Sequence, residues 1–180
     1  HQDIVVFLGA LLRFFVDFFR LGKLRVAPFE MKLYAGGPSR EPDILFIANE
    51  NRNRLTEERL AGPADLVVEV ISEDSVNRDR VKKFNEYQAS GVREYWVIDS
   101  RPNKPIADFF VADTQGKFQP ASVDANGIYR STVLPGFWLR VDWLWELELP
   151  DPLMSFGEIT GFPPDVMKKL REIAARGPQT

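Results

Sequence analysis

The sequence predicts an α/β (α+β) fold in which a mixed central β-sheet is flanked by helices. Three runs rich in branched and aromatic residues, 41–48, 64–72 and 93–99, are typical of buried strands. Two other segments, 1–22 and 73–92, carry their apolar residues at helical spacing. Because helices and strands alternate along the chain, we expect one sheet whose faces are covered by the helices.

Length and composition indicate an ordinary folded protein. The 180 residues are 44% apolar, which is enough for a core and predicts a single domain over residues 1–180. The first residue is not Met, so we expect further residues upstream. The formal net charge is −3, and any contact with DNA would therefore need a local basic patch.

The residues that are missing limit the possible chemistry. The sequence has no cysteine, which excludes disulfides and thiolate metal sites and favours a cytoplasmic location. Its one histidine, at residue 1, argues against histidine-rich zinc sites and Ser-His-Asp triads. Catalysis, if present, is expected to depend on carboxylates, Lys or Arg.

The first segment, residues 1–22, is apolar enough to be mistaken for a signal peptide or a membrane span. Its four charged residues nevertheless share one helical stripe with Val6 and Ala10; they are Asp3, Arg13, Asp17 and Arg20. That stripe predicts an amphipathic helix that covers a sheet and is ended by Gly22.

The remaining elements follow in order. Residues 23–36 are predicted as one strand, or two strands broken at Pro28, and residues 50–63 as an exposed charged connection. The helix over 73–92 is expected to begin at Asp74 or Ser75 and to stop at Gly91. Later segments predict a hairpin over 106–120, a strand within a Trp-rich apolar stretch over 127–152, and a last helix over 164–175.

Two carboxylates stand out because they interrupt apolar strands: Asp43 in "PDILFI" and Glu69 in "LVVEVIS". If the two strands are neighbours, these side chains approach each other and repel. A divalent cation between them would relieve the repulsion. Oxygen ligands without Cys or His favour Mg²⁺ or Mn²⁺, and such an ion can promote phosphodiester hydrolysis.

The helix that follows the Glu69 strand supplies a cation for the same site. Asp79, Lys83 and Tyr87 are spaced by four residues and share one helix face. If that face meets the sheet, Lys83 reaches Glu69, while Lys82 lies about 100° around the helix and points away. Lys83 could then stabilise the charge of the transition state.

Together, "PDILFI", "DLVVEVISEDS" and "RDRVKKFNEYQASGVREYWVID" resemble the Uma2 family (DUF820), predicted endonucleases of the PD-(D/E)XK superfamily. The likeness covers nearly the whole chain. It implies a restriction-endonuclease-like fold with a four-stranded mixed sheet, and DNA as the substrate. It also implies Asp43 and Glu69 as ligands of Mg²⁺ (or Mn²⁺), and Asp43, Glu69 and Lys83 as the catalytic residues. Ile71 stands where the superfamily has its lysine, and Lys83 is the proposed replacement. Glu30 is a possible further ligand.

Simpler interpretations remain open for each residue. Asp43 could be a turn residue after Pro42, Glu69 half of a buried ion pair, and Lys83 the surface partner of Asp79. Ser72 is more typical of a strand end than of a catalytic residue. The basic cluster at Arg78, Arg80, Lys82 and Lys83 suits either phosphates or solvent.

Two alternative functions also remain open. The chain could be a nuclease-fold protein that no longer cleaves and serves in binding or assembly, or a hydrolase of small phosphoesters. The apolar late residues Phe137, Trp138, Trp143 and Trp145 predict a homodimer, because one small domain is not expected to bury them all.

Overall fold

The computed structural model describes residues 1–71, 77–101 and 105–178, with the backbone alone at residues 77–80. Its helices are α1 (Gln2–Phe18), α2 (Asn77–Ser90), α3 (Pro152–Thr160) and α4 (Pro164–Arg176), with short 3-10 segments η1 (Asn49–Arg54) and η2 (Val141–Trp145). Its strands are β1 (Gly22–Val26), β2 (Glu30–Lys32), β3 (Ser39–Arg40), β4 (Ile44–Ala48), β5 (Arg59–Ala61), β6 (Leu66–Ile71), β7 (Glu94–Asp99), β8 (Ile106–Ala112), β9 (Phe118–Pro120), β10 (Ile128–Arg130) and β11 (Trp138–Arg140).

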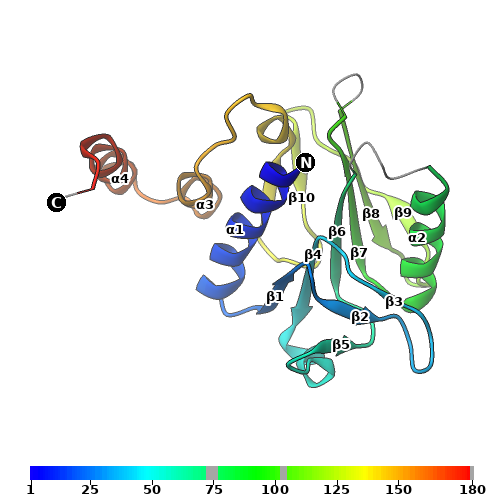
Figure 1. The fold of residues 1–180 in the computed structure, drawn as a ribbon. Coiled ribbons are helices and arrows are strands. Elements are labelled where there is room, and N and C mark those ends of the chain that lie inside the picture. Colours follow the sequence, from blue (N-terminus) through cyan, green and yellow to red (C-terminus); the bar gives the residue numbers. More distant parts are fainter. Residues whose placement is uncertain (72–76, 102–104, 179–180) are drawn as a thin grey trace.

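A six-stranded mixed sheet with the order β1-β4-β6-β7-β8-β9 forms the centre of the fold (Figure 1). Of its neighbouring strands, β6 and β7 are parallel and the other pairs are antiparallel. Strands β3, β2 and β5 form a small second sheet, and β10 pairs with β11. The predicted mixed sheet with flanking helices is therefore present, with six strands instead of the four that the resemblance implied.

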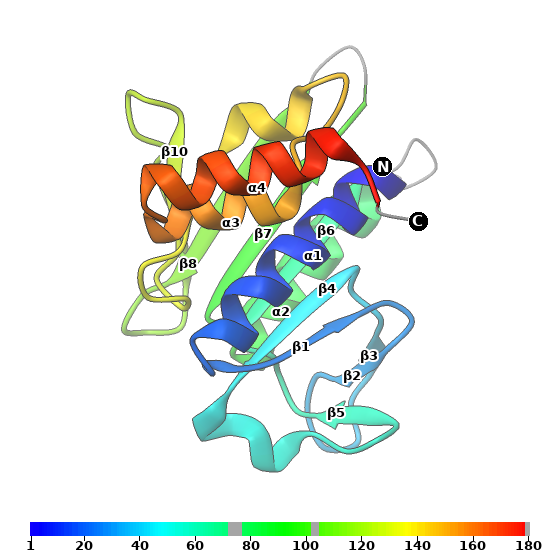
Figure 2. The same cartoon turned by 90° about the vertical axis from the view of Figure 1, so that its left-hand side faces the viewer.

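Helices cover both faces of the central sheet. Helix α1 lies across one face, together with the β10–β11 pair, and α2 lies on the opposite face (Figures 1 and 2). Alternation along β6 sends Val68 and Val70 toward α1 and Val67 toward α2. Glu69 has the same parity as Val67, so its side chain lies on the face that α2 covers.

The first helix and its connection to β1 differ from the expectation. Helix α1 ends at Phe18, and the chain reverses at Arg20, whose φ is 55°. Gly22 is the first residue of β1, where a Cβ atom would collide with the backbone of Ile47 on β4. Gly22 is therefore required by close strand packing and not as a helix stop. The exposed stripe of α1 is confirmed, with Val6 62% exposed.

Several later predictions are confirmed in part. Helix α2 stops at Gly91 (φ 94°), and the hairpin of β8 and β9 turns where expected. The predicted start at Asp74 or Ser75 lies outside the described residues. The connection over 50–63 is not wholly irregular, because it contains most of η1 and all of β5.

Helix α3 was not predicted, although its start and stop are encoded locally. The Asp151 side chain accepts hydrogen bonds from the amides of Leu153 and Met154, and Gly161 ends the helix at φ 69°. Helix α4 follows and lies farthest from the sheet, beside α3 (Figures 1 and 2). None of the helices in the described ranges combines the length and apolar composition that a membrane span needs.

Candidate active site

The two candidate carboxylates lie on neighbouring antiparallel strands. Strand β4 pairs with β6 through Ile44 opposite Val68, and one further step of this register puts Asp43 opposite Glu69. Cross-strand partners in an antiparallel pair are close neighbours on the same face. The two-carboxylate hypothesis required these two strands to be adjacent, and they are.

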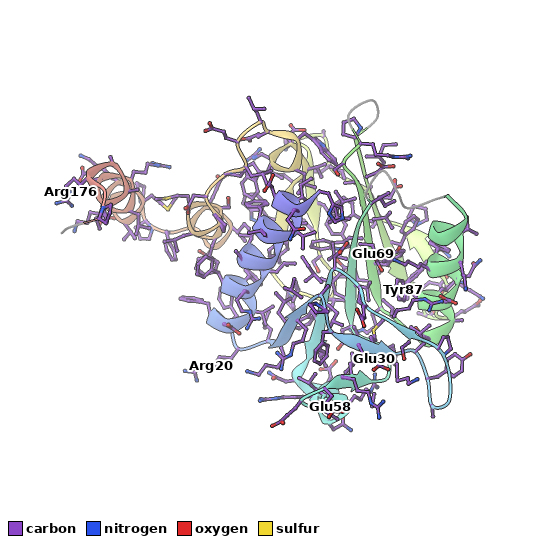
Figure 3. The ribbon with its side chains drawn as sticks, viewed as in Figure 1. Arg20, Glu30, Glu58, Glu69, Tyr87 and Arg176 are labelled. Carbon is purple, nitrogen blue, oxygen red and sulfur yellow. The ribbon has the colours of Figure 1, made fainter. Side chains whose placement is uncertain are left out.

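Glu69 is held by two side chains from α2. Lys83 Nζ donates to Oε2 at 3.1 Å, and the Tyr87 hydroxyl donates to Oε1 at 2.6 Å. These residues are four apart on the helix, so their side chains lie on one face. Figure 3 shows Glu69 and Tyr87 between the sheet and α2. Lys83 is partly buried and Lys82 is exposed, as the helical spacing predicted.

Burial disfavours the ionised form of both acids. It raises the pKa of Glu69 above the usual value for a glutamate, opposed by the charge of Lys83 and by the hydrogen bonds from Tyr87 and Lys83. Burial likewise raises the pKa of Asp43, opposed by the bond from the Val70 amide and by the charge of Lys83. The negative charge of Asp43 adds to the rise at Glu69. The charge of Lys83 lowers both pKa values but does not offset the effect of burial.

Asp43 leaves an oxygen available for a ligand. Its Oδ2 accepts a hydrogen bond from the Val70 amide at 2.7 Å, and within the described parts of the chain Oδ1 makes none. Since Asp43 is half-buried, this oxygen can still meet solvent. One or two carboxylates, completed by water and substrate phosphate, are the usual protein ligands of Mg²⁺. Asp43 and Glu69 therefore fit a hard divalent cation, because both offer carboxylate oxygens and because their combined negative charge is not fully neutralised.

Glu30 does not join this pair. It lies on β2 in the small sheet, where its Oε1 accepts a hydrogen bond from Ser39 at 2.5 Å and lies 3.9 Å from Lys32 Nζ. Figure 3 shows it apart from Glu69. Among the side chains that the structure describes, no three of His, Cys, Asp or Glu gather closely enough to hold an ion by themselves.

Some sequence expectations fall outside the described residues. Ser72 is one of them, as are the side chains of Arg78, Asp79 and Arg80. The basic cluster and the surface pair between Asp79 and Lys83 consequently stay predictions.

The sequence matches, over residues 1–142, the family described as "Uma2: Putative restriction endonuclease". This chain belongs to the Uma2 family. The matched residues contain the whole candidate site and end within η2, before α3 and α4. No curated protein matched the sequence.

The Uma2 assignment agrees with a comparison of folds. The chain is similar to the crystal structure of "a putative nuclease belonging to DUF820" from Anabaena variabilis ATCC 29413. The TM-score is 0.62 at 17% identity, and the match covers 81% of this chain and 79% of the other. At this identity the likeness establishes the shared fold.

Two contacts of this Uma2 protein's site were not anticipated from its sequence. The first is the Tyr87 hydroxyl on Glu69; the helical spacing placed Tyr87 beside Lys83 without indicating that its hydroxyl bonds the acid. The second is the His1 ring, whose Nε2 lies 2.6 Å from the Val70 carbonyl oxygen across 69 residues of chain. No local pattern signals a contact of that sequence separation.

Another buried acid was also missed, and its surroundings differ. Glu94, at the start of β7, is fully buried and accepts hydrogen bonds from Trp96, Tyr129 and the segment 131–133. Donors of this number satisfy both oxygens without a cation. Glu94 therefore ties β7 to the β10–β11 region, whereas Asp43 retains an open oxygen.

Proposed function

We propose that this Uma2 protein is a Mg²⁺-dependent endonuclease that hydrolyses DNA phosphodiester bonds, with Mn²⁺ as an alternative ion. The observation that carries the proposal is the meeting of Asp43, Glu69 and Lys83 at one end of the β4–β6 pair. The acids come from adjacent strands and the lysine from the helix on the same face. The family description supports the same reaction class.

Each side chain has a distinct role in the proposed reaction. Asp43, through its open Oδ1, and Glu69 would hold the cation beside a substrate phosphate. When bound, a divalent ion activates water and neutralises phosphate charge. Lys83 Nζ, kept in place by Glu69, would donate to a phosphate oxygen as negative charge accumulates there. The lysine thus takes the role that Ile71 cannot perform.

Cleavage of supercoiled plasmid DNA tests the proposal. We expect nicking or linearisation with Mg²⁺ or Mn²⁺, none with EDTA, and loss of cleavage in Asp43→Asn. Glu41→Gln is the matched control, because Glu41 is an exposed acid two residues away. Undiminished cleavage by Asp43→Asn would refute the assignment.

The alternative of an inactive nuclease-fold module has a structural argument in its favour. Both Glu69 oxygens already accept hydrogen bonds, so its contacts with Lys83 and Tyr87 could serve stability alone. Titration calorimetry with Mn²⁺ separates the two functions: binding that depends on Asp43 and Glu69 supports the nuclease, and no binding supports the module. Cleavage of p-nitrophenyl phosphate esters with intact DNA would instead favour the small-phosphoester hydrolase.

A homodimer remains part of the proposal, but its interface is placed on other residues than the sequence predicted. Phe137 and Trp143 are buried within the protomer, and Trp138 and Trp145 are partly buried, so these aromatic residues do not supply the exposed surface that was expected. Among the exposed aromatic residues that the structure describes, Phe14, Phe18 and Phe19 lie together on and directly after α1. We propose that this aromatic patch meets a second copy. A cytoplasmic location stays a prediction from the absence of cysteine.

A further inference from the structure

The His1 side chain connects the start of α1 to the end of β6. His1 precedes the first residue of the helix, a position where side chains commonly cap helix amides, but its ring makes no cap hydrogen bond. Its Nε2 instead lies 2.6 Å from the Val70 carbonyl oxygen, a hydrogen-bond distance. The His1 ring therefore contacts β6 and does not cap α1.

Val70 needs such a partner because of Pro42. The register that pairs Ile44 with Val68 puts Pro42 opposite Val70 after two further steps. Proline has no N–H and cannot donate to the carbonyl of a facing strand residue. On this edge of β6, two side chains replace the missing backbone partners. Asp43 Oδ2 accepts a hydrogen bond from the Val70 amide at 2.7 Å, and His1 Nε2 lies at hydrogen-bond distance from the Val70 carbonyl oxygen.

The same two side chains also share a cavity. His1 and Asp43 both line a hollow of about 290 Å³ between the first turns of α1 and the end of β1, with Gln2, Val5 and Val26 among its other walls. His1 and Asp43 thus border the same space.

We propose that His1 is a positioning residue of the cation site. By bonding the Val70 carbonyl it restrains the backbone of the residue whose amide binds Asp43 Oδ2, and so would keep Oδ1 available to a bound cation. Groups that orient a metal ligand commonly change metal affinity by about 10- to 100-fold when they are removed. The inference rests on the proposed function, since it assumes that Asp43 holds a divalent cation.

Mn²⁺ titration calorimetry of the full chain tests this role without depending on cleavage. We expect His1→Ala to weaken Mn²⁺ affinity by about tenfold or more, with a melting temperature close to that of the wild type. His1→Gln retains an N–H donor at a similar reach and is expected to recover most of the affinity. Gln2→Ala, which alters the same cavity without touching Val70, is expected to bind as the wild type does.

The outcomes separate the two levels of the proposal. Wild-type protein that binds no Mn²⁺ overturns the proposed function and the role of His1 with it. Wild-type binding that is unchanged in His1→Ala overturns the positioning role alone. A melting temperature that falls sharply in His1→Ala, without recovery of affinity in His1→Gln, would assign the ring to fold stability and also overturn it.

Discussion

The ammonium group of Lys83 lies 3.1 Å from the carboxylate of Glu69, although 14 residues separate them along the chain. This contact gives the acid in the middle of an apolar strand the cationic neighbour that its burial demands. Because burial still raises the pKa of Glu69, the lysine compensates the acid incompletely.

Glu69→Gln is expected to abolish Mn²⁺ binding without destabilising the protein at neutral pH. A raised pKa means that ionised Glu69 is less favourable in the folded than in the unfolded state. Its charge therefore opposes folding above the ordinary carboxylate pKa of about 4. Removing the charge should raise or maintain the melting temperature at pH 7, and the difference from wild type should shrink as the pH falls toward 4. A stability loss of about 3 kcal/mol or more would identify a structural buried ion pair instead.

Lys83→Met is expected to reduce DNA cleavage by about 100-fold or more, because charge stabilisation at the transferred phosphate is lost. The measurement is the single-turnover rate at saturating Mg²⁺. Lys82→Met removes the same charge from an exposed position on the same helix and should change the rate only a few-fold. Equal losses in both variants would mean that α2 contributes general electrostatic attraction to DNA and no positioned group.

Mn²⁺ affinity is expected to increase with pH over a range that begins above the usual carboxylate pKa of about 4. Both acids must be deprotonated to bind the ion, and burial raises the pKa of each. Calorimetry at a series of pH values, in buffers of different ionisation enthalpy, should show protons released on binding. Affinity that is constant from pH 4.5 to pH 8 would contradict the raised pKa values.

Tyr87→Phe is expected to shift that pH profile upward. The hydroxyl donates to Glu69 at 2.6 Å and favours its ionised form, so its removal should raise the pKa of Glu69 further. The lost hydrogen bond should also cost about 1 kcal/mol of unfolding free energy, measured by urea denaturation. Tyr34→Phe, at an exposed tyrosine, is the control. An unshifted profile would show that Tyr87 does not influence ionisation at Glu69.

Light scattering at micromolar concentration is expected to give the mass of a dimer. Phe18, which is 61% exposed, makes edge-to-face contacts with Phe19 of the aromatic patch and with the buried Phe156. Phe18→Glu should yield a monomer, since a charge placed in an apolar interface is poorly tolerated. Val6→Glu, at an exposed α1 residue outside that patch, should remain dimeric. A wild-type monomer would contradict the homodimer.

Much of the candidate site could be predicted because its signals are local. Glu69 is conspicuous as an acid among Val67, Val68 and Val70, and helical spacing alone distinguishes Lys83 from Lys82. The Pro42-Asp43 pair likewise marks a strand start with an acid beside it. These patterns depend on neighbours within a few residues, which the sequence presents directly.

Contacts between distant segments could not be predicted in the same way. The bond from His1 to Val70 spans 69 residues, and the two extra strands of the central sheet depend on which edges pair. Helix α3 is a different case, because Asp151 and Gly161 mark its ends locally.

By itself, the sequence determined which residues carry unusual chemistry and which face of each element they occupy, because alternation in strands and 3.6-residue periodicity in helices follow from backbone geometry. The register of β4 on β6 was decided only by tertiary structure. That register sets Asp43 opposite Glu69 and Pro42 opposite Val70. Strand pairing depends on packing across the whole core, and no short segment encodes it.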